Sequence, residues 1–200
     1  MVAGRHDAGI TLVELLMAIL VTSAATAALV GGIATLARAY RRIEERTVAQ
    51  QTARLVLELV GRDLRRAGFD PGGTGLEPIL EAGDHVVRIQ ADDDGSGVID
   101  DRSEELVAYV FRPDDGTLSR VVGHQSMPIA SGLPSDGCRL GFYDAVGAPL
   151  ADEGSGLDEP RRSAIRRVAL RVVVRDATHA ILADTATEVT LRNRAWTAED

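Results

Sequence analysis

Lysine is absent from this chain of 200 residues, whose 22 basic residues are all arginine. The missing ε-amino group excludes a Walker A phosphate loop, a Schiff-base lysine and a Ser-x-x-Lys acylation site. A single cysteine, Cys138, excludes an intrachain disulfide and a cysteine-rich metal site. This cysteine stands in an apolar run, and we expect it to be a small buried residue of a strand.

The low aromatic content, the negative net charge and the lack of catalytic motifs disfavour several further functions. Aromatic residues make up 4% of the chain, which disfavours base-stacking platforms, and the net charge of −8 disfavours a nucleic-acid-binding protein. The chain contains neither His-x-x-x-His nor Gly-x-Ser-x-Gly. We therefore expect a protein that is not an enzyme and does not bind nucleic acid directly.

Long apolar runs are confined to one place, residues 10–37, where 20 of 28 residues are apolar and Glu14 is the only charged one. Crossing a bilayer takes about 20 such residues, so this segment predicts a transmembrane helix. Charge divides the chain similarly. Residues 1–67 carry 9 arginines and 6 acidic residues, a net +3, whereas residues 68–200 carry a net −11.

Proline is absent before Pro71, so nothing in the sequence forces a helix to end between residues 10 and 70. We expect one helix from Ile10 to Ala67. Its second part, residues 38–70, is expected to pack on a head domain through an apolar stripe. The stripe consists of Val48, Leu55, Val56, Leu59, Leu64 and Ala67.

Short apolar runs separated by turns follow in residues 71–200, which predicts a β-rich head. The expected strands span residues 85–91, 105–112, 117–122, 138–144, 165–176 and 187–193. Residues 113–116 (PDDG) predict a hairpin turn, and residues 151–160 a polar loop. The expected fold class is therefore α+β, with a long N-terminal helix on an antiparallel β-sheet head.

The start of the chain carries a specific motif. A short leader of residues 1–9 bears Arg5 and ends in Gly9, and the string ITLVELLMAIL follows with Glu14 inside it. This pattern resembles the class III signal of type IV prepilins and pseudopilins. The resemblance implies that prepilin peptidase cuts after Gly9 and that the new amine of Ile10 is methylated.

The position of Glu14 gives an independent physical reason for cleavage after Gly9. A carboxylate within a membrane span costs about 2.5–3.5 kcal/mol, so it requires a partner. Cutting after Gly9 creates an α-amino group that is positive at neutral pH, since its reference pKa is about 8. We expect Glu14 to pair with this amine, in its own chain or in a neighbouring subunit of a filament. The alternative is an acidic residue that snorkels to the membrane interface.

A second segment indicates which group of prepilins the chain resembles. Residues 50–70, QQTARLVLELVGRDLRRAGFD, are similar to the end of the stalk helix in PilW-like minor pilins. J-type pseudopilins of type II secretion share the Arg-Asp-Leu-Arg core, residues 62–65. On physical grounds alone, Asp63 forms a weak helix pair with Arg62 or Arg66, worth about 0.3 kcal/mol. The paired arginines at 41–42, 65–66, 161–162 and 166–167 are interpreted as solvated faces or contacts to neighbouring subunits.

The resemblance implies a minor pilin that helps to prime type IV pilus assembly. Its expected partners are prepilin peptidase, other minor pilins, the major pilin and the inner-membrane assembly platform. The protein is expected to cross the inner membrane once, with a cytoplasmic N-terminus and an extracytoplasmic head, before it enters a pilus or pseudopilus. Two alternatives stay open: a J-type pseudopilin, and a signal-anchored calcium-binding adhesin or binding module.

Residues 92–104, DDDGSGVIDDRSE, are similar to the ligand spacing of an EF-hand loop. The calcium ligands predicted by this spacing are Asp92, Asp94, Ser96, the carbonyl of Val98, Asp100 and Glu104. Glu104 stands one residue later than the spacing requires, and the flanking segments read as strands rather than helices. The alternative to a calcium site is a solvated acidic turn.

Overall fold

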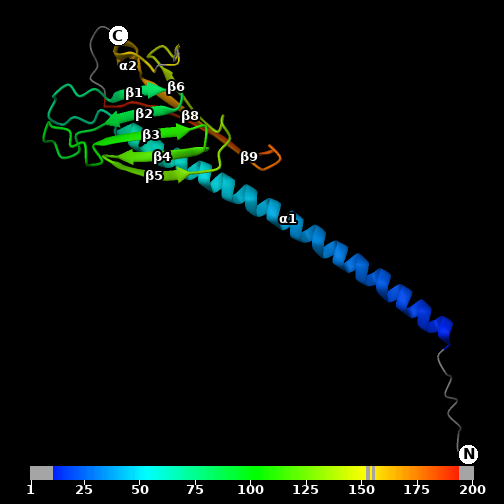
Figure 1. Ribbon diagram of the computed structural model, residues 1–200. Helices are drawn as coiled ribbons and strands as arrows, with labels where there is room; N and C mark the ends of the chain where they lie inside the picture. The colour runs from blue at the N-terminus through cyan, green and yellow to red at the C-terminus, as the bar shows by residue number, and fades with distance from the viewer. Residues whose placement is uncertain (1–10, 152–153, 155, 194–200) are drawn as a thin grey trace, which may run out of the picture. The chain divides into compact units, whose positions relative to one another are not determined.

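The structure is a computed structural model that describes residues 11–151, 154 and 156–193. The chain divides into two compact units, residues 1–45 and 46–200, and a single helix runs through the boundary between them. Beyond the helix, the described residues of the second unit form two antiparallel sheets and one short helix (Figure 1). The expected α+β class, a long apolar N-terminal helix packed on antiparallel sheets, is confirmed.

The long helix, α1, spans Leu12–Arg66, close to the expected range of Ile10 to Ala67. Ile10 lies outside the described residues. The helix ends at a turn in which Gly68 has a φ of +73° and donates its N–H to the Gln90 carbonyl at 2.8 Å. A Cβ at this glycine would lie 2.7 Å from Cγ of Pro78, so both conformation and space favour glycine here.

The buried stripe of α1 differs in part from the expected one. Val56, Leu64 and Ala67 are buried and Leu59 is partly buried, as predicted. The predicted burial of Val48 and Leu55 is wrong, because these side chains are 55% and 66% exposed. Small residues take their place on the buried face, at spacings of three and four. The buried residues of α1 are Ala49, Ala53, Val56, Leu57, Val60, Gly61, Asp63 and Leu64.

A five-stranded antiparallel sheet follows the helix, with its strands in the order β1-β2-β3-β4-β5. Each strand pairs with the next along the chain, so the sheet is a simple meander. Its strands are β1 (Ile79–Gly83), β2 (Val86–Gln90), β3 (Leu106–Arg112), β4 (Thr117–Val122) and β5 (Gln125–Ala130). The expected hairpin turn joins β3 to β4, and its Gly116 has a φ of +65°.

A four-stranded antiparallel sheet completes the head, in the order β7-β6-β8-β9. Its strands are β6 (Cys138–Tyr143), β7 (Pro149–Leu150), β8 (Arg167–Arg175) and β9 (Ile181–Thr190). A short helix, α2 (Glu159–Ala164), precedes β8, and its N-cap Asp158 accepts a bond from the Arg161 N–H. Cys138 is buried in β6, as expected, and burial raises the pKa of its thiol to about 12.

One hydrophobic core joins the C-terminal part of α1 to both sheets. Val56, Val60 and Leu64 of the helix belong to the same buried cluster as Val87 of β2 and Val168 of β8. Buried carbons of this kind contribute about 25 cal/mol per Å² of apolar surface removed from water. The core therefore fixes the second part of α1 against the sheets, and it begins at Ala49.

Five of the six expected strands are confirmed within two residues at each end, namely β2, β3, β4, β6 and β8. The sixth, expected at residues 187–193, is misplaced, because β9 begins at Ile181 and ends at Thr190. Three strands were not expected: β1 follows Pro78, β5 contains Pro128, and β7 has two residues. Proline disfavours a strand interior, but β5 is an edge strand, where proline is tolerated. The expected loop 151–160 contains the start of α2.

Candidate functional site

The first part of α1 exposes apolar side chains on all of its faces. Every residue from 11 to 48 is exposed, and by length and composition the helix is able to cross a membrane. Residues 12–37 span about 39 Å at 1.5 Å per residue, more than the roughly 30 Å of a hydrocarbon core. The large apolar residues exposed between positions 12 and 36 are Leu12, Val13, Leu15, Leu16, Met17, Ile19, Leu20, Val21, Leu29, Val30, Ile33 and Leu36.

Glu14 lies in the first turn of this helix and is exposed. Its backbone N–H donates to Oγ1 of Thr11 at 3.2 Å, so Thr11 acts as the helix N-cap. The Thr-x-x-Glu spacing that produces this contact is visible in the sequence as a capping box. A carboxylate also interacts favourably with the amino end of a helix. Gly9 and Ile10 lie outside the described residues.

The acidic segment before β3 brings three carboxylates together. Asp92 and Glu105 are buried, Asp94 is exposed, and one oxygen atom of each lies within 4.8 Å of the others. The sequence prediction named Glu104 instead of Glu105. The structure turns Glu104 away from this group, since its carboxylate lies 3.5 Å from Nη1 of Arg120.

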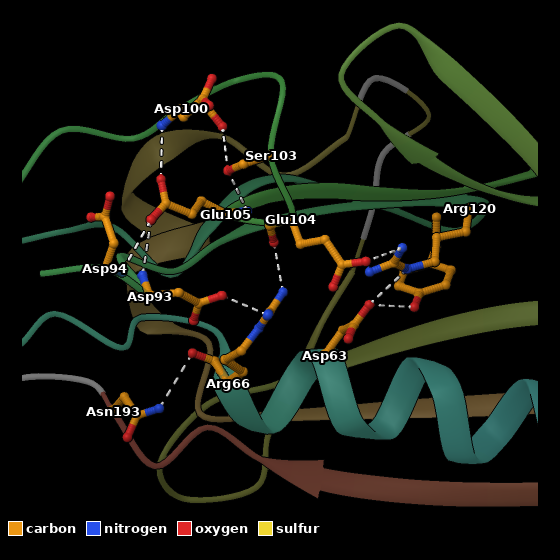
Figure 2. Close-up of polar contacts among 11 residues, drawn as sticks. Asp63, Arg66, Asp93, Asp94, Asp100, Ser103, Glu104, Glu105, Arg120 and Asn193 are labelled. Atoms are coloured by element: carbon orange, nitrogen blue, oxygen red, sulfur yellow. Dashed lines mark hydrogen bonds and ion pairs between the residues drawn. The ribbon is translucent and has the colours of Figure 1, made fainter. Parts of the chain in front are cut away.

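The oxygen atoms of the two buried carboxylates bind backbone amides of their own loop. Glu105 accepts bonds from the N–H groups of Asp93, Asp94 and Asp100, at 3.0, 3.4 and 2.9 Å (Figure 2). Asp92 accepts bonds from Ser96 and Gly97 at 3.1 and 2.9 Å. These bonds offset the cost of burying both charges, so the loop holds its shape through its own amides.

The remaining predicted ligands are also bonded within the loop. Ser96 donates its hydroxyl to the Val98 carbonyl at 3.0 Å, and Asp100 accepts a bond from the Arg102 N–H at 2.9 Å. Hydrogen bonds from Ser96 lower the pKa of the Asp94 carboxyl. Among the described residues, the structure groups the carboxylates of Asp92 and Asp94 with that of Glu105 as able to share one cation, and the predicted carboxylates of Asp100 and Glu104 are not in that group.

Arg66, in the last turn of α1, ties the helix to this loop. Its guanidinium donates to Oδ2 of Asp93 and to the Glu104 carbonyl, both at 2.6 Å (Figure 2). Burial raises the pKa of the Asp93 carboxyl, and the charge of Arg66 acts in the opposite direction. The side-chain amide of Asn193 donates to the carbonyls of Arg65 and Arg66 at 3.2 and 3.3 Å, and so caps the helix end.

Asp63 corrects the expectation of a weak pair within the helix. It is buried, and its Oδ2 accepts bonds from the Tyr109 hydroxyl at 2.7 Å and from Nε of Arg120 at 3.0 Å (Figure 2). Arg62 pairs with Glu58 instead, and Arg66 with Asp93. Burial and the contact with Asp63 both raise the pKa of Tyr109. The sequence carries one sign of this site: Asp63 stands three residues after Val60, a spacing that places both residues on the same, buried face of α1.

Comparison of the chain with models of protein families, with curated proteins and with solved structures finds no match.

Proposed function

We propose that this chain is a minor pilin, a subunit that is anchored in the inner membrane and then helps to prime type IV pilus assembly. One observation carries the proposal: an apolar helical segment is exposed on every face and contains a single carboxylate, Glu14, in its first turn. Exposed apolar surface of this extent requires a lipid or protein partner. The two environments of a pilin helix, first bilayer and then filament core, both supply one.

Glu14 supports a filament subunit over a plain membrane anchor. An anchor requires only apolar residues, and a carboxylate among them is costly in hydrocarbon. In the proposed mechanism, prepilin peptidase cuts after Gly9 and the amine of Ile10 is methylated, and this amine neutralises Glu14 during assembly. The carboxylate then distinguishes a correctly placed subunit from one that is out of register. The proposed role requires no catalysis by the chain itself.

The mature N-terminus tests this proposal directly. The full chain is expressed with a prepilin peptidase, purified from membranes and analysed by mass spectrometry. We expect a protein that begins at N-methylated Ile10, and a slower cut for Gly9→Ala. An intact leader in the presence of an active peptidase contradicts the proposal and favours the signal-anchored alternative. Co-purification with sheared pili, rather than with secretion-system subunits, separates a minor pilin from a J-type pseudopilin.

A calcium-binding module is the second candidate, and the grouping of Asp92, Asp94 and Glu105 favours it. Carboxylate oxygens are the ligands that Ca²⁺ prefers. Titration calorimetry of the full chain with CaCl₂ tests this candidate, with Asp94→Asn as the variant and Asp114→Asn as the matched control. If the wild type and Asp94→Asn give equal heats of binding, whether these exceed the buffer blank or not, the result contradicts a calcium site at this position.

A further inference from the structure

Three arginines follow the apolar part of α1 directly. These residues, Arg38, Arg41 and Arg42, are here called the arginine cluster. Arg41 and Arg42 follow Arg38 by three and four residues, so the three lie on one side of about one helical turn. All three are exposed. Leu36, two residues before the cluster, is an exposed apolar residue. The cluster therefore stands at the point where a membrane-spanning helix leaves the hydrocarbon.

The arginine cluster has no ionic partner among the residues that the structure describes. Arg38 donates its Nε to the Ala34 carbonyl at 3.1 Å, a contact within its own helix. None of the ion pairs of the described residues includes Arg38, Arg41 or Arg42. Like charges three and four residues apart repel one another along a helix. Glu45 lies on the same face, four residues after Arg41 and three after Arg42, but it forms no ion pair with either among the described residues, so an external anion at this face would relieve the repulsion.

Two further observations favour lipid over protein as the source of the anion. Tyr40 lies at the same level of the helix as the cluster, on another face, and is 71% exposed, and tyrosine is enriched at the level of lipid headgroups. The buried face of α1 begins only at Ala49, so the cluster has no packing role in the head. A guanidinium also matches a phosphate group well, because it donates two parallel hydrogen bonds.

We propose that Arg38, Arg41 and Arg42 bind the phosphate groups of anionic phospholipids on the side of the membrane that faces the head. The site fixes the depth of α1 in the bilayer. This proposal rests on the membrane insertion that the proposed function requires. It depends neither on cleavage after Gly9 nor on entry into a filament.

Lipid retention tests the proposal. The full chain is reconstituted into vesicles of equal parts phosphatidylglycerol and phosphatidylcholine, washed at alkaline pH, extracted in mild detergent and repurified, and the bound lipids are counted by mass spectrometry. We expect the wild type to retain phosphatidylglycerol over phosphatidylcholine by at least about fivefold, the factor that one arginine contributes at an anionic surface. The triple variant Arg38→Gln, Arg41→Gln, Arg42→Gln is expected to retain both lipids equally.

The matched control removes three exposed arginines from the other part of the same helix, as Arg54→Gln, Arg62→Gln, Arg65→Gln, and is expected to keep the wild-type ratio. An unchanged ratio in the cluster variant overturns the proposal. The same unchanged ratio with loss of a co-purifying pilin subunit also overturns it, and assigns the cluster to a protein contact. Release of the wild type by the alkaline wash contradicts membrane insertion itself, and so overturns the proposed function together with the lipid site.

Discussion

Asp63 carries its charge on the buried face of α1, and two side chains of the five-stranded sheet hold it there. Its side chain is 6% exposed and that of its partner Arg120 is 14% exposed, so little solvent screens the pair. Tyr109 donates a second hydrogen bond to the same oxygen. Buried ion pairs of this kind are weak evidence of added stability, but they are costly to break, because the remaining charge then has no partner.

Asp63→Asn is therefore expected to lower the free energy of unfolding by about 3 kcal/mol, at the lower end of the range for breaking a buried pair. Glu104, 3.5 Å from Arg120, still offers that arginine a carboxylate and limits the loss. Urea unfolding of the full chain in detergent, followed by near-ultraviolet circular dichroism, measures the change. The control Glu58→Gln removes a carboxylate that is 69% exposed and is expected to unfold close to the wild type. Equal losses in both variants would show that Asp63 does not act through a buried charge.

Asp70, just after the end of α1, makes stability depend on pH. Hydrogen bonds from the backbone at Thr74, Leu76 and Gly75 lower the pKa of its carboxyl below 3.8. The unfolded chain therefore binds the proton more readily, so this contribution to stability is complete above about pH 4 to 5 and is lost as the pH falls further. Asp70→Asn is expected to flatten the fall in urea midpoint below pH 4. Asp114→Asn, an exposed change in the hairpin turn, should leave that fall unaltered.

At the scale of elements, the sequence was most informative where alternation and turn residues agree. β4 has the expected bounds because the PDDG turn fixes its start, and β8 was found because apolar and polar residues alternate along it. β1 and β5 were missed because a proline, which disfavours strands, stands just before the first and within the second. In the folded chain, pairing with a neighbouring strand outweighs this local preference. The helix stripe was misplaced because large residues were preferred over Ala49 and Ala53, although the head packs on these alanines.

The turn after α1 provides a test at this scale. Gly68→Ala must adopt a positive φ and also place a Cβ 2.7 Å from the Pro78 ring, so a loss of more than about 2 kcal/mol is expected. Gly73→Ala is the matched control, because its φ is +65° and nothing lies within 4 Å of the added Cβ. It should lose only about 1 kcal/mol, the cost of the backbone conformation. Equal urea midpoints for the two variants would contradict a steric role for Pro78.

The acidic loop shows which part of a candidate site a spacing rule is able to find. The rule selected Asp92 and Asp94, which the structure places together, but it took Glu104 because that residue lies nearer the twelfth position of the loop. Glu105 was missed because the turn just before β3 directs its carboxylate to the amides of the loop and directs that of Glu104 toward Arg120. A linear motif carries no information on the conformation of that turn.

Glu105→Gln tests whether this loop depends on its own hydrogen bonds. The carboxylate accepts three backbone N–H bonds, and an amide in its place offers only one acceptor atom. We expect a loss of about 1–3 kcal/mol in the free energy of unfolding, with or without added calcium, and faster hydrogen exchange at residues 93, 94 and 100. Glu104→Gln, the neighbouring change, should leave exchange at these amides as in the wild type. A loss that appears only with calcium present would instead assign Glu105 to a metal.

At the scale of the whole molecule, the two units differ in whether their apolar residues are buried. The second unit buries its apolar residues in a core of its own, whereas the first exposes them along its described length. Composition alone predicted this division, because apolar residues and net positive charge concentrate in the first third of the chain. In the proposed function, lipid and then neighbouring subunits cover the exposed segment.

Glu14 is the residue through which that assembly is tested. Glu14→Gln keeps the size of the side chain and removes its charge, so membrane insertion should be unchanged or improved. Incorporation into sheared filaments should fall at least about tenfold, because the subunit would lose the proposed charge pair with an N-terminal amine in a medium of low dielectric. Ser23→Ala is the control, since among the described residues its hydroxyl donates a hydrogen bond to the Leu20 carbonyl of its own helix. Quantitative immunoblotting of membrane and filament fractions separates the two steps. Equal incorporation of Glu14→Gln and the wild type would remove the pairing from the mechanism, since the apolar surface is then sufficient for assembly.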